Sequence, residues 1–335
     1  MTRKQPTIYD VARLAGVSIS TVSRVLNQPQ RVNQQTLEAV QAAIDSLGFV
    51  PKAEARARAL KDTGRIGVLT PFFAEPSFTQ RLRGISAALQ QTSYEMVIYP
   101  VDSQRRLNGY LQGLPITRNL DGLIMISIHL TMPQMEMLTQ YGMPVVVIED
   151  PHELASTVEF DNPGGGRMAA DLLTGRGHRQ LGFVGVPDTD LPDYSIHPVY
   201  ERLTGFRTRL GELGIRLAEE HVSMVAYDLE TTSRVASSML QTRNCPTAFF
   251  AGTDLQALGV LKACRQLQLR VPQDVAVLGF DDIDISAYVG LSTIRQPLDE
   301  SGRVAAELLL SRIADPGRLL QHVLLPLTLI ERETT

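Results

Sequence analysis

Hydroxyl, guanidinium and amide side chains share one face of a helix expected from residue 18 to about residue 27. At 3.6 residues per turn, Ser20, Arg24 and Asn27 point away from the apolar face that includes Val22. The outward face contains no acid. Such groups can hydrogen-bond base edges and phosphates, and the first turn of a recognition helix lies deepest in the major groove of DNA. The alternative is an ordinary helical hairpin with a solvated polar face.

The residues before this helix predict the element that must hold it. Thr7 with Asp10 three residues later forms a capping box, apolar residues recur at helical spacing, and Gly16 ends this first helix. Ser18 is a favourable N-cap for the second helix. Two short helices joined by a glycine turn predict a helix-turn-helix. The side chains expected to contact DNA here are Thr7, Tyr9, Ser18, Ile19, Ser20, Thr21, Ser23, Arg24 and Asn27.

A third helix, capped by Asn33 and ended by Gly48, completes an all-α headpiece expected over residues 1–48. Residues 49–64 are rich in alanine and arginine and predict a hinge helix or linker. A helix of about nine residues is shorter than the ~12 to 15 residues that are marginally stable in water. We therefore expect this hinge to fold only when supported, as when it pairs with its dimer mate on DNA. The alternative is a plain linker.

The charge balance separates the headpiece and hinge from the rest of the chain. Of 335 residues, 44% are hydrophobic and 20% are charged, which is typical of globular proteins, and the formal net charge is -4. Residues 1–64 carry nine Lys and Arg against five Asp and Glu, a net charge of +4, so the remainder carries -8. A cationic region on an acidic body favours a polyanionic partner such as DNA.

Several classes of protein are disfavoured. Cys245 and Cys264 have no CxxC spacing, so we expect no disulfide framework and a reducing cytoplasm. The basic N-terminus lacks an apolar signal core, and no apolar run approaches the ~18 residues of a membrane span. The six histidines are scattered, so no metal site is expected.

Enzymatic patterns are weak or missing. Residues 164–169 satisfy the dinucleotide pattern GxGxxG/A, but the strand before them is short and is interrupted by Asp161, Asn162 and Pro163. The sequence has no GxxxxGK[S/T] loop and no GxSxG elbow. We therefore predict no cofactor and no enzymatic activity.

From Arg65 onward, short apolar strands alternate with amphipathic helices. Strands are expected at residues 66–70, 95–100, 122–128, 145–149, 181–186, 222–227, 248–252 and 275–281. Helices are expected to begin near Ser77, Met132, Gly164, Tyr200, Thr232, Asp254 and Leu298. This alternation is typical of doubly wound parallel sheets, and more than eight units exceed one sheet of ordinary width. The expected fold class is α/β, with a two-lobed body and a cleft between the lobes.

The order of headpiece, alanine-rich hinge and two-lobed α/β body resembles the lactose/galactose repressor (LacI/GalR) family of bacterial transcription regulators. The resemblance covers essentially the whole chain. Its most specific blocks are IYDVARLAGVSISTVSRVLN, FDNPGGGRMAADLLTGRGHRQLGFVG near residues 161–185, RLTGF at residues 202–206, and residues 252–283 with GTDLQALGVL and RVPQDVAVLGFDDI.

The resemblance implies an effector-binding and dimerisation domain over residues 65–335, similar to a periplasmic sugar-binding protein. The chain would cross between the lobes near Asn162, Leu291 and Leu324. The N-lobe would comprise about residues 65–162 and 292–324, and the C-lobe about residues 163–291 and 325–335. These boundaries are implied by the family pattern.

The family's effector binds in the cleft between the lobes. The positions that match its contacts are Phe72, Phe73, Asp161, Arg202, Tyr227, Thr253, Asp254, Asp281 and Gln296. Carboxylates and an arginine can form charge-assisted hydrogen bonds to hydroxyls, and an aromatic ring can cover an apolar sugar face. We expect Asp161, Arg202 and Asp281, from separate blocks, to converge on one cleft.

The resemblance also implies a hinge side chain in the minor groove. Leu60 could wedge between base steps, whereas Arg58 would read the width and charge of the groove. Both residues remain candidates.

The function implied is that of a cytoplasmic, nucleoid-associated repressor that binds a pseudo-palindromic operator. The chain shows no heptad tail like that of tetrameric members, so a homodimer is expected. The effector is expected to be a sugar or sugar derivative, and the alternatives are a nucleobase, a sugar phosphate or a protein partner.

Overall fold

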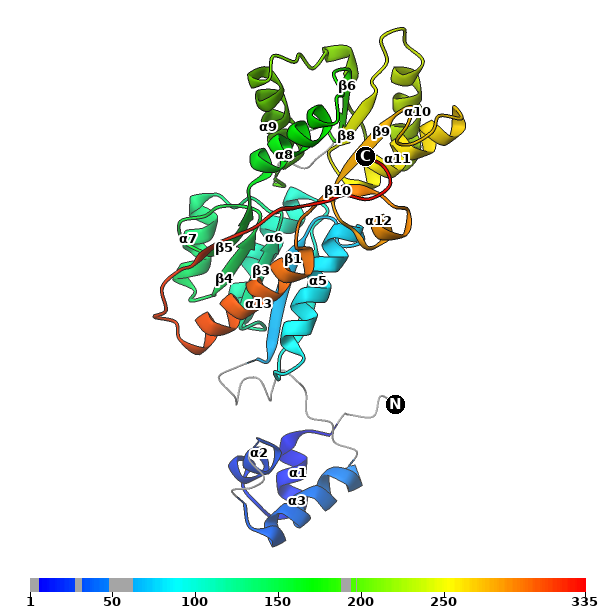
Figure 1. The fold of residues 1–335 in the computed structure, drawn as a ribbon. Coiled ribbons are helices and arrows are strands. Elements are labelled where there is room, and N and C mark those ends of the chain that lie inside the picture. Colours follow the sequence, from blue (N-terminus) through cyan, green and yellow to red (C-terminus); the bar gives the residue numbers. More distant parts are fainter. Residues whose placement is uncertain (1–5, 28–31, 48–62, 188–193, 197) are drawn as a thin grey trace.

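The computed structural model describes residues 6–27, 32–47, 63–187, 194–196 and 198–335 of the chain. The headpiece consists of helices α1 (Ile8–Ala15), α2 (Ile19–Asn27) and α3 (Gln34–Leu47) (Figure 1). The expected hinge helix, with Arg58 and Leu60, lies outside the described residues, as does the expected end of α3 at Gly48.

Short-range hydrogen bonds set the ends of the headpiece helices. The backbone N–H of Thr7 donates to Oδ2 of Asp10 at 2.9 Å, which confirms the capping box, and Gly16 ends α1 with a φ of 67°. Ser18 Oγ accepts from the N–H of Thr21 at 3.1 Å, and Asn33 Oδ1 accepts from the N–H of Thr36 at 2.8 Å. The predicted starts of α2 and α3 are therefore confirmed.

The headpiece core is small and is formed by all three helices. Val11 of α1, Val22 of α2 and Val40 of α3 are fully buried against one another. Leu14 belongs to the helically spaced apolar residues of α1 in the sequence, but it lies outside this core, and its side chain is 55% exposed.

The first lobe contains a six-stranded sheet in the order β11-β5-β4-β3-β1-β2, and all of its pairings are parallel. Its strands are β1 (Arg65–Thr70), β2 (Glu95–Pro100), β3 (Gly122–Ile126), β4 (Val145–Ile148), β5 (Ser156–Phe160) and β11 (His322–Leu325). Its helices are α5 (Pro76–Leu89), α6 (Gln104–Thr117), α7 (Met132–Gln140) and α13 (Leu298–Ala314).

The second lobe contains another six-stranded sheet, in the order β12-β10-β9-β8-β6-β7. Its strands are β6 (Leu181–Gly185), β7 (Val222–Met224), β8 (Ala248–Ala251), β9 (Ala276–Asp281), β10 (Ser292–Arg295) and β12 (Thr328–Ile330), of which β12 is antiparallel to β10. Its helices are α8 (Asn162–Gly175), α9 (Pro198–Glu212), α10 (Leu229–Leu240), α11 (Asp254–Gln266) and α12 (Asp284–Tyr288). Two doubly wound lobes confirm the expected α/β class.

The chain crosses between the lobes three times, and one crossing falls later than expected. β5 ends at Phe160 in the first sheet and α8 begins at Asn162 in the second lobe, close to the expected position. β10 still pairs with β9 up to Arg295, so the second crossing follows Gln296 rather than Leu291. β11 pairs with β5 up to Leu325, so the third crossing lies close to the expected Leu324. The difference at the second crossing arises because the short strand β10 extends the second sheet beyond the expected boundary.

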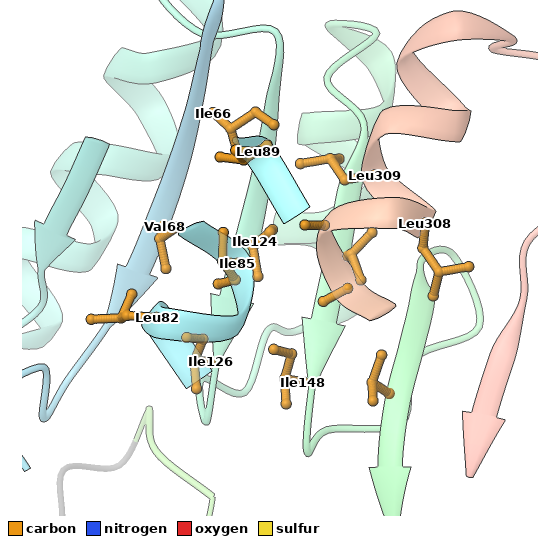
Figure 2. Packing of buried hydrophobic residues seen from close by; sticks show 14 of the residues in the cluster. Ile66, Val68, Leu82, Ile85, Leu89, Ile124, Ile126, Ile148, Leu308 and Leu309 are labelled. Atoms are coloured by element: carbon orange, nitrogen blue, oxygen red, sulfur yellow. The ribbon is translucent and has the colours of Figure 1, made fainter. Parts of the chain in front are cut away.

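In the first lobe, α5 and α13 cover one face of the sheet. Figure 2 shows Leu82, Ile85 and Leu89 of α5 and Leu308 and Leu309 of α13 gathered over the strand residues of this core. The two helices can approach closely because each has a glycine at the contact. A Cβ on Gly84 would lie 1.8 Å from the carbonyl oxygen of Asp299, and a Cβ on Gly302 would lie 2.0 Å from that of Arg81.

In the second lobe, α8 and α9 also pack closely through a glycine on each helix. A Cβ on Gly205 would lie 1.9 Å from the carbonyl oxygen of Pro163, and a Cβ on Gly166 would lie 2.0 Å from that of Arg202. In both lobes, therefore, a glycine contact positions the backbone of an arginine, which is Arg81 on α5 and Arg202 on α9.

Candidate functional site

The polar face of α2 lies on the surface of the headpiece. Ser18, Ser20 and Arg24 are exposed, whereas Thr21 and Ser23 are half-buried. Ser18 Oγ lies 2.7 Å from Ser20 Oγ, so the first turn of the helix is ordered by hydroxyls. Among the residues that the structure describes, Arg24 forms no ion pair, which leaves its guanidinium able to bind a base edge or a phosphate.

The remaining DNA-contact candidates surround this face. Thr7 is exposed at the start of α1, the Tyr9 side chain is 64% exposed, and Ile19 is 41% exposed at the start of α2. Asn27 is the last residue of α2. Exposed Tyr9 and Ile19 are unusual for apolar side chains on so small a core, and they suit contact with a partner surface.

A cavity of about 540 Å³ lies between the two lobes, within the roughly 300–1,000 Å³ of sites that enclose small molecules. Six of the nine residues expected at the effector site line it: Phe72, Arg202, Tyr227, Thr253, Asp281 and Gln296. Five further polar side chains, which were not among the expected effector contacts, line it as well: Glu75, Ser77, Arg81, Ser127 and Glu149.

Arg202 and Asp281 form the charged pair of the second lobe. Nη1 of Arg202 lies 3.5 Å from Oδ1 of Asp281, and the two side chains are only 3% and 6% exposed. The guanidinium also donates to Asn162 Oδ1 at 3.0 Å and to the carbonyl oxygen of Gly252 at 2.7 Å, and it stacks 3.7 Å from the ring centre of Phe280. Arg202 is thus held in one orientation from four sides.

Burial dominates the titration of this pair. Loss of hydration raises the pKa of Asp281 to about 6, although the nearby Arg202 and Arg81 draw it down. Loss of hydration also lowers the pKa of Arg202. A ligand hydroxyl that donates to the carboxylate would replace part of the lost hydration.

Arg81 and Glu149 form a second charged pair, in the first lobe. Nη2 of Arg81 donates to Oε1 of Glu149, and the side chains are 2% and 4% exposed. The hydroxyl of Ser127 donates to the other carboxylate oxygen of Glu149. The rings of Phe78 and Phe160 lie 5.5 Å and 5.9 Å from the guanidinium carbon.

Gln296 connects the two charged pairs at a crossing between the lobes. Its Nε2 donates to Oδ1 of Asp281 at 2.8 Å, and its Oε1 accepts from Nη2 of Arg81 at 3.4 Å. The polar wall of the cavity therefore runs without interruption from Glu149 through Arg81, Gln296 and Asp281 to Arg202.

Aromatic rings provide the apolar part of the cavity. Phe72 packs edge-on against Phe78 with ring centres 5.6 Å apart. Burial raises the pKa of Tyr227 far above its usual range, so its phenol stays neutral and can donate a hydrogen bond. A ring beside a wall of donors and acceptors suits a polyhydroxylated ligand with one apolar face.

Three residues expected at the effector site are not part of the cavity lining. Phe73 follows β1 by three residues and points to solvent, with 45% of its surface exposed. Asp161 is the N-cap of α8 and accepts from the N–H of Gly164 at 2.8 Å, so the expected convergence with Arg202 and Asp281 does not occur. Asp254 is fully buried in the second lobe.

Asp254 instead ties three segments of the second lobe together. It accepts hydrogen bonds from the N–H of Ile283 at 2.9 Å and from the hydroxyls of Ser286 and Thr293, each at 2.6 Å. Burial raises the pKa of Asp254 to about 7, and the hydrogen bonds from the three donors make this rise smaller than burial alone would.

The Asp254→Asn variant is expected to lose about 1–3 kcal/mol of the free energy of unfolding, because an amide N–H would face donors. The difference from the parent should be largest near pH 5 and smaller at pH 8. The raised pKa gives a stabilisation that is complete below the unfolded value of about 4 and is lost as the pH rises through about 7. Urea unfolding at pH 5 to 8 measures the difference. Asp274→Asn, whose carboxyl has a pKa lowered to about 2 by Arg270, should show no such trend, and a gap that widens with pH would contradict the assignment.

Within the part of the chain that the structure describes, no helix is long and apolar enough to cross a membrane. The same residues contain no group of three or more His, Cys, Asp or Glu side chains that could hold a metal ion.

Comparison with known proteins matches both parts of the chain to families. Residues 7–52 match the family of bacterial regulatory proteins, lacI family, and residues 170–335 match a periplasmic binding protein-like domain. The HTH-type transcriptional regulator CelR of Thermobifida fusca is 33% identical over 95% of this chain and 96% of its own. The ribose operon repressor of Escherichia coli K12 is 32% identical over 97% and 98%, and the Escherichia coli repressor PurR is 31% identical over 98% and 96%.

Solved structures agree with these relatives along the whole chain. A complex of CelR with cellobiose is 32% identical, covers 98% of this chain and 100% of its own, and has a TM-score of 0.69. The lac repressor dimer bound to operator and the anti-inducer ONPF is 26% identical, covers 99% of each chain, and has a TM-score of 0.82. The chain therefore belongs to the LacI family of bacterial regulatory proteins and is a DNA-binding transcriptional regulator.

Proposed function

We propose that this regulator is a repressor that binds a pseudo-palindromic operator as a homodimer, and that a sugar or sugar derivative in the cavity controls its affinity for DNA. The observation that carries the proposal is the polar wall of the cavity, to which both lobes contribute. Residues 1–48 would read the operator, residues 49–64 would form the hinge, and residues 65–335 would bind the effector and the dimer mate, with Leu60 or Arg58 in the minor groove.

The chemistry of the cavity favours a sugar. Carboxylates of Glu149 and Asp281 can accept from hydroxyls, and the guanidiniums of Arg81 and Arg202 can donate to them. Phe72 can cover an apolar ring face. The complex of CelR with cellobiose supports the same class of ligand.

A nucleobase is the second candidate, and the similarity to the repressor PurR favours it. Phe72 and Tyr227 could stack on a base, and Thr253 could hydrogen-bond its edge. A nucleobase carries fewer donors and acceptors around its ring than a polyhydroxylated sugar, so it would use fewer of the polar groups in the wall. A sugar is therefore the better match to this cavity.

Control of DNA binding requires the ligand to favour one arrangement of the lobes. A ligand shifts an equilibrium only by the difference between its affinities for the two states. Because the cavity wall combines first-lobe and second-lobe groups with a side chain at a crossing, its geometry depends on how the lobes are arranged. A bound ligand would therefore bias that arrangement and, through the hinge, the spacing of the two headpieces.

The test is a thermal-shift screen of the full-length protein against sugars, sugar phosphates and nucleobases, followed by operator titrations with each compound that binds. A ligand that binds the folded state and not the unfolded chain raises the stability by an amount that grows with the logarithm of its concentration relative to its Kd. A sugar that raises the melting temperature and changes operator affinity supports the proposal. If only nucleobases do so, the second candidate is correct.

Arg24→Ala is expected to weaken operator binding by about 1–3 kcal/mol if Arg24 reads a guanine, with relaxed selectivity at one base pair. If it binds phosphate only, affinity should fall equally on all sequences and the salt dependence should become less steep. Gel-shift titrations on operator and random DNA at several salt concentrations distinguish the two. Arg13→Ala, on α1 and paired with Asp10, is the control, and an Arg24→Ala variant that binds like the parent would contradict the assignment of this face.

A further inference from the structure

The two lobes are built on one plan around the cavity. In each lobe the first strand leads to a helix that carries an arginine three residues before a glycine, namely Arg81 and Gly84 on α5 and Arg202 and Gly205 on α9. The glycines bring these helices against α13 and α8 at equivalent distances. The two arginines therefore occupy corresponding places in the two lobes.

The carboxylates correspond in the same way. Glu149 directly follows β4 and Asp281 ends β9, and each of these is the fourth strand of its lobe along the chain. Both residues have a left-handed backbone, with φ of 79° and 121°. A non-glycine residue adopts such a conformation only where its surroundings hold it, and strain of this kind concentrates at binding sites.

Arg81 has donors that none of the described residues uses. Both of its hydrogen bonds to described residues come from Nη2, to Glu149 and to Gln296. A guanidinium has five N–H donors, and Arg81 lines the cavity. Nη1 therefore remains able to donate to a ligand while Nη2 holds Glu149.

We propose that Arg81 and Glu149 are the first-lobe counterpart of Arg202 and Asp281, and that these two neutral pairs make the cavity select an uncharged polyhydroxylated ligand over its phosphorylated or carboxylated forms. This inference rests on the proposed function of the cavity. To that proposed function it adds Arg81 and Glu149 as specificity-determining residues, and it adds that the ligand is uncharged.

The charge balance carries the selectivity. Each guanidinium in the wall is already matched by a carboxylate, so the cavity holds no uncompensated cation for a phosphate. Glu75 is a third carboxyl group in the lining, and burial raises its pKa. An anion would have to give up its hydration and approach the carboxylates of both pairs, and the cost of burying an anion without a cationic partner disfavours the charged ligand. A hydroxyl loses far less hydration and finds both donors and acceptors.

The first measurement uses the parent protein alone. Titration calorimetry compares glucose with glucose 6-phosphate and with glucuronate, ribose with ribose 5-phosphate, and cellobiose as a two-ring probe. We expect at least one neutral sugar to bind, and to bind at least tenfold more tightly than its charged form. Equal or tighter binding of a charged form would overturn the inference while leaving the proposed function intact. Failure of every sugar, neutral or charged, would overturn both.

The second measurement uses Glu149→Gln, which leaves the Arg81 charge without its partner. We expect the preference for the neutral sugar over its charged form to narrow at least tenfold, because the cavity then has a free cation. The double variant Arg81→Met with Glu149→Gln removes both charges at similar volume, and it should lose at least tenfold in affinity for the neutral sugar.

The matched control is the surface pair of the same lobe, Arg106→Met with Asp102→Asn, whose side chains are 48% and 62% exposed. It should bind all probes like the parent. If Glu149→Gln keeps the parental preference, or if the folded double variant keeps the parental affinity, Arg81 and Glu149 do not contact the ligand. Thermal unfolding verifies that each variant is folded. If a variant does not fold, the titrations of the parent protein with neutral and charged sugars still decide the charge of the ligand.

Discussion

Arg202→Ala is expected to lose about 3–5 kcal/mol of the free energy of unfolding and to lose the response to ligand completely. The loss of stability follows from removing one partner of a buried ion pair, since Asp281 would remain buried without its cation. The same truncation removes the donors to Asn162 and Gly252, which join α8 and the end of β8 to the cavity. Operator binding should persist wherever the variant is folded, because the headpiece has its own core.

Urea unfolding, titration calorimetry with the active sugar and operator titration measure the three quantities on one preparation. Arg207→Ala provides the control, because this arginine lies five residues further along α9, is 41% exposed and pairs with Glu219 at the surface. Its stability should change by less than about 1 kcal/mol. An Arg202→Ala variant that still responds to the sugar would show that the ligand lies outside this cavity.

Gly205→Ala is expected to cost about 1–3 kcal/mol or more of stability and to weaken sugar binding, because the new Cβ would meet the backbone of Pro163. A carbonyl oxygen at 1.9 Å cannot yield as a flexible side chain would, so α9 must move away from α8. Arg202 lies one turn from Gly205 on the same helix and would move with it.

The control for this prediction is Gly211→Ala, in the last turn of α9, where a Cβ would meet nothing within 4 Å. There alanine should raise the free energy of unfolding, by up to about 1 kcal/mol, because it restricts the unfolded chain and favours helix. Opposite signs at Gly205 and Gly211 would confirm that the contact, and not helix propensity, decides the first result. A neutral Gly205→Ala would contradict the close packing of α8 and α9.

Segments up to β9 that carry an apolar pattern were predictable from the sequence, including the short β7 and β8, whereas the polar β5 and the short strands after β9 were not. The expected strand at residues 95–100 agrees with β2, and α13 begins at the expected Leu298. β5 was not anticipated because Ser, Thr and Glu dominate it, and β10, β11 and β12 are only three or four residues long. α6 was missed because Gly109, Gly113 and Pro115 break its helical pattern, although packing in the first lobe still holds it.

Lining residues of the cavity were predictable at positions that match ligand contacts of the family. Lining residues at other positions of this chain were missed. Arg81 and Glu149 match no position that the resemblance singled out. Their signal was internal to the sequence, because RLRGI at residues 81–85 repeats the form of RLTGF at residues 202–206, and Glu149 closes an expected strand as Asp281 does. Asp161 and Asp254 were misplaced because a carboxylate that caps a helix or joins buried loops has the same sequence appearance as one that faces a ligand.

The three crossings between the lobes impose an order on synthesis at the ribosome. The strands β1 to β5 are complete at Phe160, but the helix that covers them, α13, begins only at Leu298. At ~5–20 residues per second, α13 begins to emerge roughly 7 to 28 s after Phe160 is made, and until then it cannot cover Val146 and Ile148. A ribosome that stops in this interval releases a chain with a finished headpiece and an unfinished first lobe. Such a fragment could still bind DNA through α2. It would lack Gln296 and a complete cavity, so an effector could not control its binding.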